Sequence, residues 1–115
     1  MDLRRGEVYW VDFDPSIGGE IQKTRPAVIV SNDDANAVLN RVLVVPFSSQ
    51  IGRVYPGEAL VQLRGRTSKA LADQLTAASK IRVKGRIGAV SSEDMAAIEK
   101  IILLQLDIEI RGSRS

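Results

Sequence analysis

The most constraining feature of this sequence is a short, continuous β-branched run, 28–30, which directly follows Arg25, Pro26 and Ala27. Continuous apolar residues predict a strand buried on both faces rather than one that alternates between core and water. Proline suits the first position of such a strand, where its missing N–H costs no ladder bond. The pattern therefore places Arg25 at the start of a rigid strand, either as a solvated charge or as a cation directed at a ligand.

The size and hydrophobicity of the chain suit one compact domain. Its 115 residues are 44% hydrophobic, which is enough to build a single core. We expect one domain over 1–110 and a disordered polar tail over 111–115. The first residues lack the apolar core of a signal peptide and no apolar run reaches bilayer length, so we expect a cytoplasmic protein.

Two residue types are missing, and their absence limits the available chemistry. The sequence contains no cysteine and no histidine. Disulfides, thiolate zinc sites and cysteine nucleophiles are therefore excluded, and the commonest general base and metal ligand is absent. Any catalysis has to use Arg, Lys, Asp, Glu, Ser, Thr or Tyr, and we expect no metal and no cofactor.

Charge is unevenly distributed, although the formal net charge is only +2. Between positions 41 and 86 there are nine basic residues and two acidic ones. This asymmetry points to a polyanionic partner such as nucleic acid, and scattered solubilising charge is the alternative. The residues that could form a cationic track, or merely solvate a face, are Arg53, Lys80, Arg82, Lys84 and Arg86.

Alternation and turn formers predict several short strands and few helices. The segment 41–47 is expected to be buried on both faces, Gly65 marks a turn, and 68–77 fits a helix or a strand. The long loop 14–20 contains glycine and is of the kind that often carries function. We expect strands at 6–13, from 26 to about 31, at 41–47, 58–63 and 86–90, with helical turns at 35–39 and 80–83.

A C-terminal helix is predicted from Ser91 onward. Ser91 suits the N-cap and Asp94 lies three residues later, in capping-box fashion. Ile98, Ile101 and their neighbours follow helical spacing, but further leucines and isoleucines over 103–108 widen the apolar surface beyond one stripe. Because so small a domain cannot bury all of this surface, we expect a homodimer that uses this helix or a strand beside it.

Five motifs, in this order and spacing, resemble the MazF/PemK (Kid) toxin family. They are GEVYWVDF at 6–13, Gly19-Glu20, RPAVIVS at 25–31, VPFSS at 45–49 and Ala72-Asp73-Gln74. The resemblance implies a mainly β fold with short helices, a small SH3-like (CcdB/PemK-like) β-barrel with a C-terminal α-helix. It also implies a homodimeric, sequence-specific, metal-independent endoribonuclease that leaves 2′,3′-cyclic phosphate and 5′-hydroxyl ends on single-stranded RNA. A MazE-like antitoxin is the implied partner.

By this resemblance Arg25 is the catalytic arginine and Ser48 the catalytic hydroxyl. The RNA supplies its own 2′-hydroxyl nucleophile, so the protein has to orient groups, stabilise charge on phosphorus and move protons. A guanidinium fork suits the phosphate but is a poor base. Glu20 and Asp73 are the available carboxylates, and Asp73 could equally be structural. Leu71 replaces an arginine that some family members carry.

Base recognition is expected from the loop 14–23 and from polar side chains near the strand ends. Aromatic residues of the first strand either stack on bases or belong to the core. The expected RNA-binding residues are Phe13, Ser16, Gly19, Gln22, Lys23, Ser49, Gln50, Gln74 and Arg82.

Two other classes of function remain open at this point. A CcdB-like gyrase-inhibiting toxin would leave RNA uncut, although that family lacks the Arg25-Pro26 motif. A non-catalytic SH3-like RNA-binding module would bind RNA with a steep salt dependence and also leave it intact.

Overall fold

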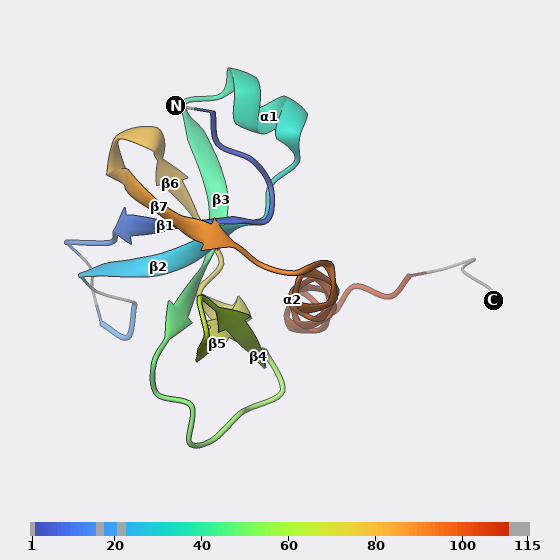
Figure 1. Cartoon of the computed structure of the whole chain (residues 1–115). Helices are drawn as coiled ribbons and strands as arrows, with labels where there is room; N and C mark the ends of the chain where they lie inside the picture. Colours follow the sequence, from blue (N-terminus) through green and yellow to red (C-terminus); the bar gives the residue numbers. More distant parts are fainter. Residues whose placement is uncertain (1, 16–17, 21–22, 111–115) are drawn as a thin grey trace.

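The computed structural model describes residues 2–15, 18–20 and 23–110, and this part of the chain forms a curled antiparallel sheet with a C-terminal helix (Figure 1). It confirms the predicted mainly β fold. None of the described helices is long and apolar enough to cross a membrane. The elements are β1 Glu7–Asp12, β2 Thr24–Ile29, α1 Asp33–Val38, β3 Arg41–Ser48, β4 Glu58–Leu63, β5 Arg66–Leu71, the 3₁₀ turn η1 Ala72–Gln74, β6 Thr76–Ser79, the 3₁₀ turn η2 Lys80–Arg82, β7 Val83–Ala89 and α2 Ser92–Gln105.

The sheet bends because β3 changes its partner halfway along. The strand order is β4-β5-β3-β2-β1-β7, with β6 also paired to β3. The first half of β3 pairs with β6 up to Val44, and its end pairs with β5 from Phe47 onward. Pro46 lies between these two ladders, so its missing N–H breaks neither of them. The bend gives the molecule its half-barrel shape.

Strand β2 is buried as its sequence predicts, but its bounds differ from the expectation. Ala27, Val28 and Ile29 are fully buried, and the strand ends at Ile29 rather than at Ser31. Pro26 is its third residue, not its first. Pairing with β3 begins only at Ala27, so β1 is the sole ladder partner of Pro26 and the proline is tolerated there.

The expectation that 41–47 is buried on both faces is wrong for its first half. Leu43 is 43% exposed, whereas Val42 and Val44 on either side of it are buried. Over this half only one face of β3 contacts a core, so the residues alternate. Burial becomes continuous from Val44 to Phe47, where both faces are covered.

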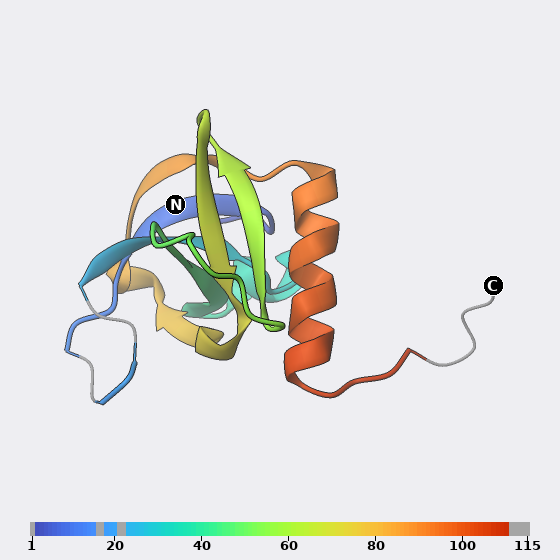
Figure 2. The same ribbon diagram turned by 90° about the horizontal axis from the view of Figure 1, so that it is seen from below.

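Each face of the curled sheet packs against its own core cluster. The first cluster gathers Phe47, Val61 and the helix residues Ile98 and Ile101, and α2 covers it beside the β4–β5 hairpin (Figure 2). The second cluster, on the other side, is formed by Leu3, Tyr9, Val11, Ala27, Ile29, Val42, Val44, Ala78 and Val83.

Helix α2 begins at the predicted cap but uses its acidic residue differently. The Asp94 backbone N–H donates to Ser91 Oγ (3.0 Å), as expected of the N-cap. The Asp94 carboxylate does not close a capping box; it accepts from the Gln62 backbone N–H of β4 (2.8 Å). Asp94 therefore fixes the first turn of α2 to the sheet.

The remaining segments settle the ambiguous parts of the sequence. The stretch 68–77 becomes the end of β5, the turn η1 and the start of β6, so it is neither one helix nor one strand. The last strand begins at Val83 rather than at Arg86. Helix α1 is capped by Asn32, whose side chain accepts from the Ala35 N–H (2.8 Å), and η2 lies where a helical turn was predicted. The expected tail over 111–115 lies outside the described residues.

Candidate functional site

Two hollows hold most of the predicted site residues. The first, here called the arginine groove, has a volume of about 620 Å³ and contains both Arg25 and Ser48. Strands β1, β2, β3, β4, β5 and β7 contribute to it, so it exists only in the folded sheet. Its lining residues are Trp10, Thr24, Arg25, Pro26, Phe47, Ser48, Ser49, Leu63, Arg64, Arg66, Thr67, Ser68 and Ile87.

Arg25 and Ser48 reach the arginine groove from neighbouring strands. Arg25 is half-buried near the start of β2, opposite Val11 of β1. Ser48 ends β3, and its Oγ accepts from the Gln50 backbone N–H (3.1 Å). This bond orients the hydroxyl without using its hydrogen, so the hydrogen can still be donated. A guanidinium and an oriented hydroxyl in one groove can together hold a phosphate.

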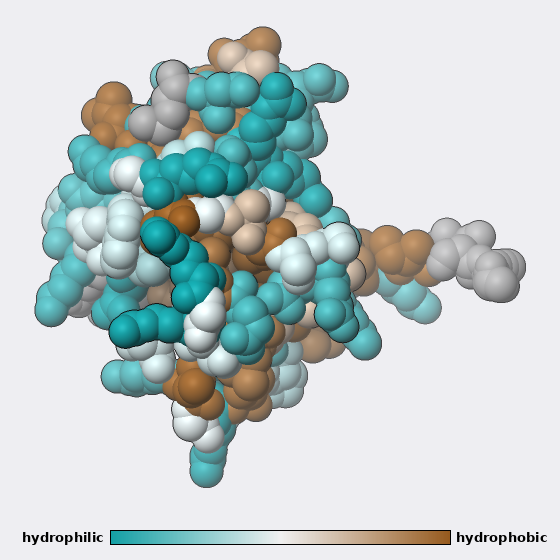
Figure 3. Space-filling model, viewed as in Figure 1, coloured by the Kyte–Doolittle hydropathy of each residue, from teal (hydrophilic) through white to brown (hydrophobic). Residues whose placement is uncertain are grey.

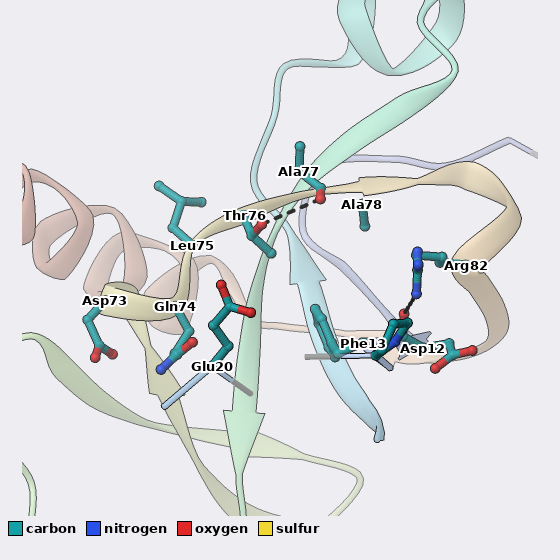
Figure 4. A pocket seen from close by; sticks show the side chains of 11 residues that line it. Asp12, Phe13, Glu20, Asp73, Gln74, Leu75, Thr76, Ala77, Ala78 and Arg82 are labelled. Atoms are coloured by element: carbon teal, nitrogen blue, oxygen red, sulfur yellow. Dashed lines mark hydrogen bonds between the residues drawn. The ribbon is translucent and has the colours of Figure 1, made fainter. Parts of the chain in front are cut away.

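The second hollow, here called the carboxylate pocket, has a volume of about 340 Å³ and contains Glu20 and Asp73 (Figure 4). Gln74, Phe13 and Arg82, three of the expected RNA-binding residues, also line it. In Figure 4 the Glu20 side chain points toward Thr76, whereas the Asp73 carboxylate points away from Glu20. The other lining residues are Asp12, Pro15, Leu75, Thr76, Ala77 and Ala78.

The two hollows lie next to each other at the loop end of the β1–β2 hairpin. Thr24, which lines the arginine groove, pairs directly across the ladder with Asp12, which lines the carboxylate pocket. Directly paired residues have Cβ atoms about 5 Å apart. The two hollows are therefore adjacent at this end of the hairpin.

Several bonds hold the described parts of the 14–23 loop against the carboxylate pocket. Gln74 Nε2 donates to the Gly19 carbonyl (3.2 Å). The Lys23 backbone N–H donates to Asp14 Oδ1 (2.8 Å), and the Phe13 N–H donates to the Lys23 carbonyl (2.9 Å). Lys23 therefore connects the loop through its backbone, with its side chain exposed and outside both hollows. Ser16 and Gln22 lie outside the described residues.

Most members of the proposed cationic track have structural partners. Arg82 donates to the carbonyls of Asp12 (3.1 Å) and Asp14, which holds the loop to η2. Arg86 is paired with Glu7 (3.0 Å). Lys80 and Lys84 donate to the backbone carbonyls of Asn36 and Ile81, and Arg53 lies over the Tyr55 ring at 5.8 Å.

The structure separates the three aromatic residues that the sequence left undecided. Burial is the main cause that raises the pKa of Tyr9, whose hydroxyl donates to Glu7 Oε1 (3.1 Å), so Tyr9 is a neutral core residue. Trp10 is 44% exposed and lines the arginine groove. Phe13 is half-buried in the carboxylate pocket.

Sequence reasoning missed Arg64 and Arg66 as site residues. Both counted toward the basic surplus of the central segment, but nothing local connected them to Arg25. The β4–β5 turn carries them into the arginine groove. The basic surplus was the only signal that could have found them.

Comparison with known proteins gives a consistent result. Residues 4–106 match the family described as PemK-like, MazF-like toxin of type II toxin–antitoxin system. The chain is 38% identical to the endoribonuclease MazF9 of Mycobacterium tuberculosis, over 92% of this chain and 98% of the relative. A crystal structure of MazF from Deinococcus radiodurans superimposes with a TM-score of 0.84 at 22% identity, covering 94% and 99% of the two chains. A mycobacterial endoribonuclease in complex with its cognate antitoxin has a TM-score of 0.78 at 22% identity, covering 93% and 97%.

Proposed function

Because the chain belongs to the PemK-like, MazF-like toxins of type II toxin–antitoxin systems, we propose that it is a sequence-specific endoribonuclease that cuts single-stranded RNA. The observation that carries the proposal is the meeting of Arg25, Ser48 and Ser49 in one open groove. A guanidinium and two hydroxyls suit the oxygens of a phosphodiester. The 38% identity to a protein named as an endoribonuclease supports the same activity.

The reaction is a transesterification in which the RNA supplies the nucleophile. The 2′-oxygen forms a bond to the adjacent phosphorus as its proton leaves to a base. The bond from phosphorus to the 5′-oxygen breaks, and that oxygen takes up a proton. The products are a 2′,3′-cyclic phosphate and a 5′-hydroxyl end. Arg25 stabilises the charge that develops on the phosphate oxygens, and Ser48 donates a hydrogen bond to the same group.

We assign the role of proton acceptor to Glu20. Its side chain lies in the carboxylate pocket at the loop end of the β1–β2 hairpin (Figure 4). Asp73 also lines a separate hollow with Tyr55 and Gln105, and its carboxylate points away from Glu20. Glu20→Gln should therefore reduce turnover more than Asp73→Asn does. The reverse order would move the base to Asp73.

The proposed reaction uses no metal ion. The sequence has no histidine or cysteine, and within 2–15, 18–20 and 23–110 no three acidic side chains are grouped closely enough to hold a metal. Cleavage should therefore proceed in EDTA. Loss of cleavage in chelator, with specific recovery on adding magnesium, would contradict this mechanism.

The proposed partners are a MazE-like antitoxin and a second copy of the chain. The antitoxin is supported by the mycobacterial complex, whose toxin shares this fold. The antitoxin would occupy the arginine groove that RNA also needs. The homodimer is supported by apolar residues that stay exposed on the last turn of α2 and on 106–110, a segment that projects from the body and shows apolar atoms in Figure 3.

Substitution of Arg25 tests the proposed function. Arg25→Ala should lower turnover by about 10²–10³, the usual cost of removing one transition-state donor. Arg25→Lys should recover only part of this loss, because it keeps the charge but not the fork. The assay incubates purified protein with a long single-stranded RNA in EDTA and maps the chemistry of the new ends.

The control measures affinity separately from turnover. An oligonucleotide with a 2′-deoxy sugar at the mapped cut site binds but cannot react, and Arg25→Ala should weaken its binding far less than it slows cleavage. Equal losses of both would make Arg25 a phosphate anchor only. RNA left intact by the wild-type protein would support a gyrase-binding or RNA-binding role instead.

A further inference from the structure

The arginine groove contains a second set of groups that the reaction does not use. Arg64 and Arg66 line it from the β4–β5 hairpin, and Trp10 lines it from β1. Both arginines are exposed. Among the described residues neither guanidinium is paired with a carboxylate or hydrogen-bonded to a carbonyl, in contrast to Arg82 and Arg86. Two available cations therefore lie in the same groove as Arg25.

The hairpin turn holds Arg64 in a conformation that its side chain disfavours. Leu63 pairs with Arg66, so the turn consists of Arg64 and Gly65 alone. Their φ angles are +53° and +78°, and a turn with two positive φ angles prefers Asn-Gly or Gly-Gly. A Cβ-bearing residue at such a position is strained. An arginine at a turn position that favours asparagine or glycine, beside a groove, is typical of a residue kept for function rather than for stability.

Trp10 provides a flat apolar surface beside these cations. Its side chain is 44% exposed although it belongs to a central strand, and it lies across the ladder from Pro26. Gly85 of β7 lies beside the indole, since a Cβ there would sit 4.0 Å from Trp10 Cδ1. A partly exposed indole with arginines near it is the arrangement that stacks an unpaired base and holds its phosphates.

We propose that Trp10, Arg64 and Arg66 form a flanking-nucleotide subsite, which stacks one unpaired base on the indole and holds the neighbouring phosphates with the two guanidiniums. The inference rests on the proposed cleavage of RNA, because Arg25 in the same groove marks the position of the reacting phosphate. The subsite contacts base faces and phosphates, so it does not require a 2′-hydroxyl. Single-stranded DNA should therefore occupy it too.

Trp10 is the only tryptophan of the chain, which makes it a direct reporter of this subsite. Adding a short all-deoxy oligonucleotide, which cannot be cleaved, should quench its fluorescence. Arg64→Asn and Arg66→Gln should each weaken this binding by about tenfold. Each should also make the slope of log K against log salt shallower by about 0.7, the value for one lost phosphate contact on a single strand.

The Arg64→Asn variant separates binding from folding. Asparagine tolerates positive φ, so the melting temperature should stay the same or rise by about 2–5 °C even though binding weakens. In RNA cleavage, substitution of the subsite residues should raise KM and leave kcat nearly unchanged, because these residues hold substrate and transition state equally. A fall in kcat at constant KM would overturn the assignment.

A matched control uses another exposed arginine. Arg41 lies at the opposite end of β3 and lines neither hollow of the site, so Arg41→Asn should change binding little. Unquenched Trp10 fluorescence, or equal effects of Arg41→Asn and Arg64→Asn, would overturn the subsite while cleavage continued. Quenching by the deoxy oligonucleotide without any RNA cleavage would instead overturn the proposed function and leave the subsite standing.

Discussion

The Ser48 hydroxyl is positioned by its own backbone loop, which makes it a sensitive residue to vary. Its Oγ accepts from the Gln50 N–H (3.1 Å), and its hydrogen can point at the phosphate. Ser48→Ala should lower turnover by about 10-fold or more, yet less than Arg25→Ala, because a neutral donor stabilises less than a guanidinium. Ser48→Thr keeps the hydroxyl and should retain most activity. Single-turnover kinetics would measure both variants.

Asp33 should make stability depend on pH. The pKa of Asp33 lies below its ordinary value of 3.8. The main cause is the hydrogen bond that its carboxylate accepts from the Arg5 backbone N–H (2.7 Å), and the next is the bond that it accepts from Asn36 Nδ2 (3.1 Å). A lowered folded-state pKa gives stability that is present above the ordinary value and is lost as the pH falls through the folded value. Asp33→Asn should therefore melt at a lower temperature than wild type at pH 6, and the difference should shrink below pH 4. Asp34→Asn, one residue along the same helical turn, is the control, and an equal pH profile for both variants would contradict the assignment.

Among single residues, the family resemblance predicted Arg25 and Ser48 as partners in one site. The structure places both in the arginine groove, and their catalytic roles stay predictions. The sequence did not identify Arg64 or Arg66. Their place in the groove depends on a hairpin that folds back across the sheet, some forty residues away from Arg25 in the chain. Sequence proximity carries no information on such a contact.

Among the elements, the strands with clear alternation were predicted well and the bent ones were not. Strand β4 has the expected bounds, Glu58–Leu63. One of its faces packs against the core and the other faces solvent, so its residues alternate between apolar and polar as strand prediction requires. Strand β7 starts earlier than predicted, since its pairing with β1 shifts register on both sides of Tyr9. A register shift breaks the two-residue period on which strand prediction depends.

The loop 49–57 is held in place by a buried charge on β5. Lys69 is only 8% exposed; its Nζ pairs with Glu58 Oε1 (3.1 Å) and donates to the Arg53 carbonyl (2.9 Å). Removing one partner of a buried pair typically costs about 3–5 kcal/mol. Lys69→Met should destabilise the fold by about this amount and speed tryptic cleavage after Arg53. Limited proteolysis and denaturant unfolding would measure the two effects.

Lys100 offers the matched substitution for this experiment. It is an exposed residue of α2, so Lys100→Met should leave both the unfolding midpoint and the cleavage after Arg53 unchanged. Because Lys69 pairs with Ser48 in the β3–β5 ladder, Lys69→Met should also slow RNA cleavage. Stable protein with an intact loop would show that the ion pair does not order this segment.

At the scale of the whole molecule, surface apolar residues predict a dimer. Leu104, Leu106, Ile108 and Ile110 are each more than half exposed in the single chain. Sedimentation at micromolar concentration should give twice the monomer mass of 12.5 kDa. Ile108→Glu should shift the protein toward monomer without unfolding it, because this side chain contributes little to the core. A wild-type monomer that cuts RNA would contradict the dimer.

The pairing of the last strand of the chain with the first has a consequence during protein synthesis. The last strand, β7, pairs with the first, β1, and it supplies Ile87 to the groove that β1 lines with Trp10. While the chain is still growing on the ribosome, the arginine groove lacks the part that β7 supplies, until this strand emerges. We expect a chain that ends at residue 82 to leave RNA uncut, as the same cleavage assay would show. The toxin would then be harmless to the message being translated until its own synthesis is nearly complete.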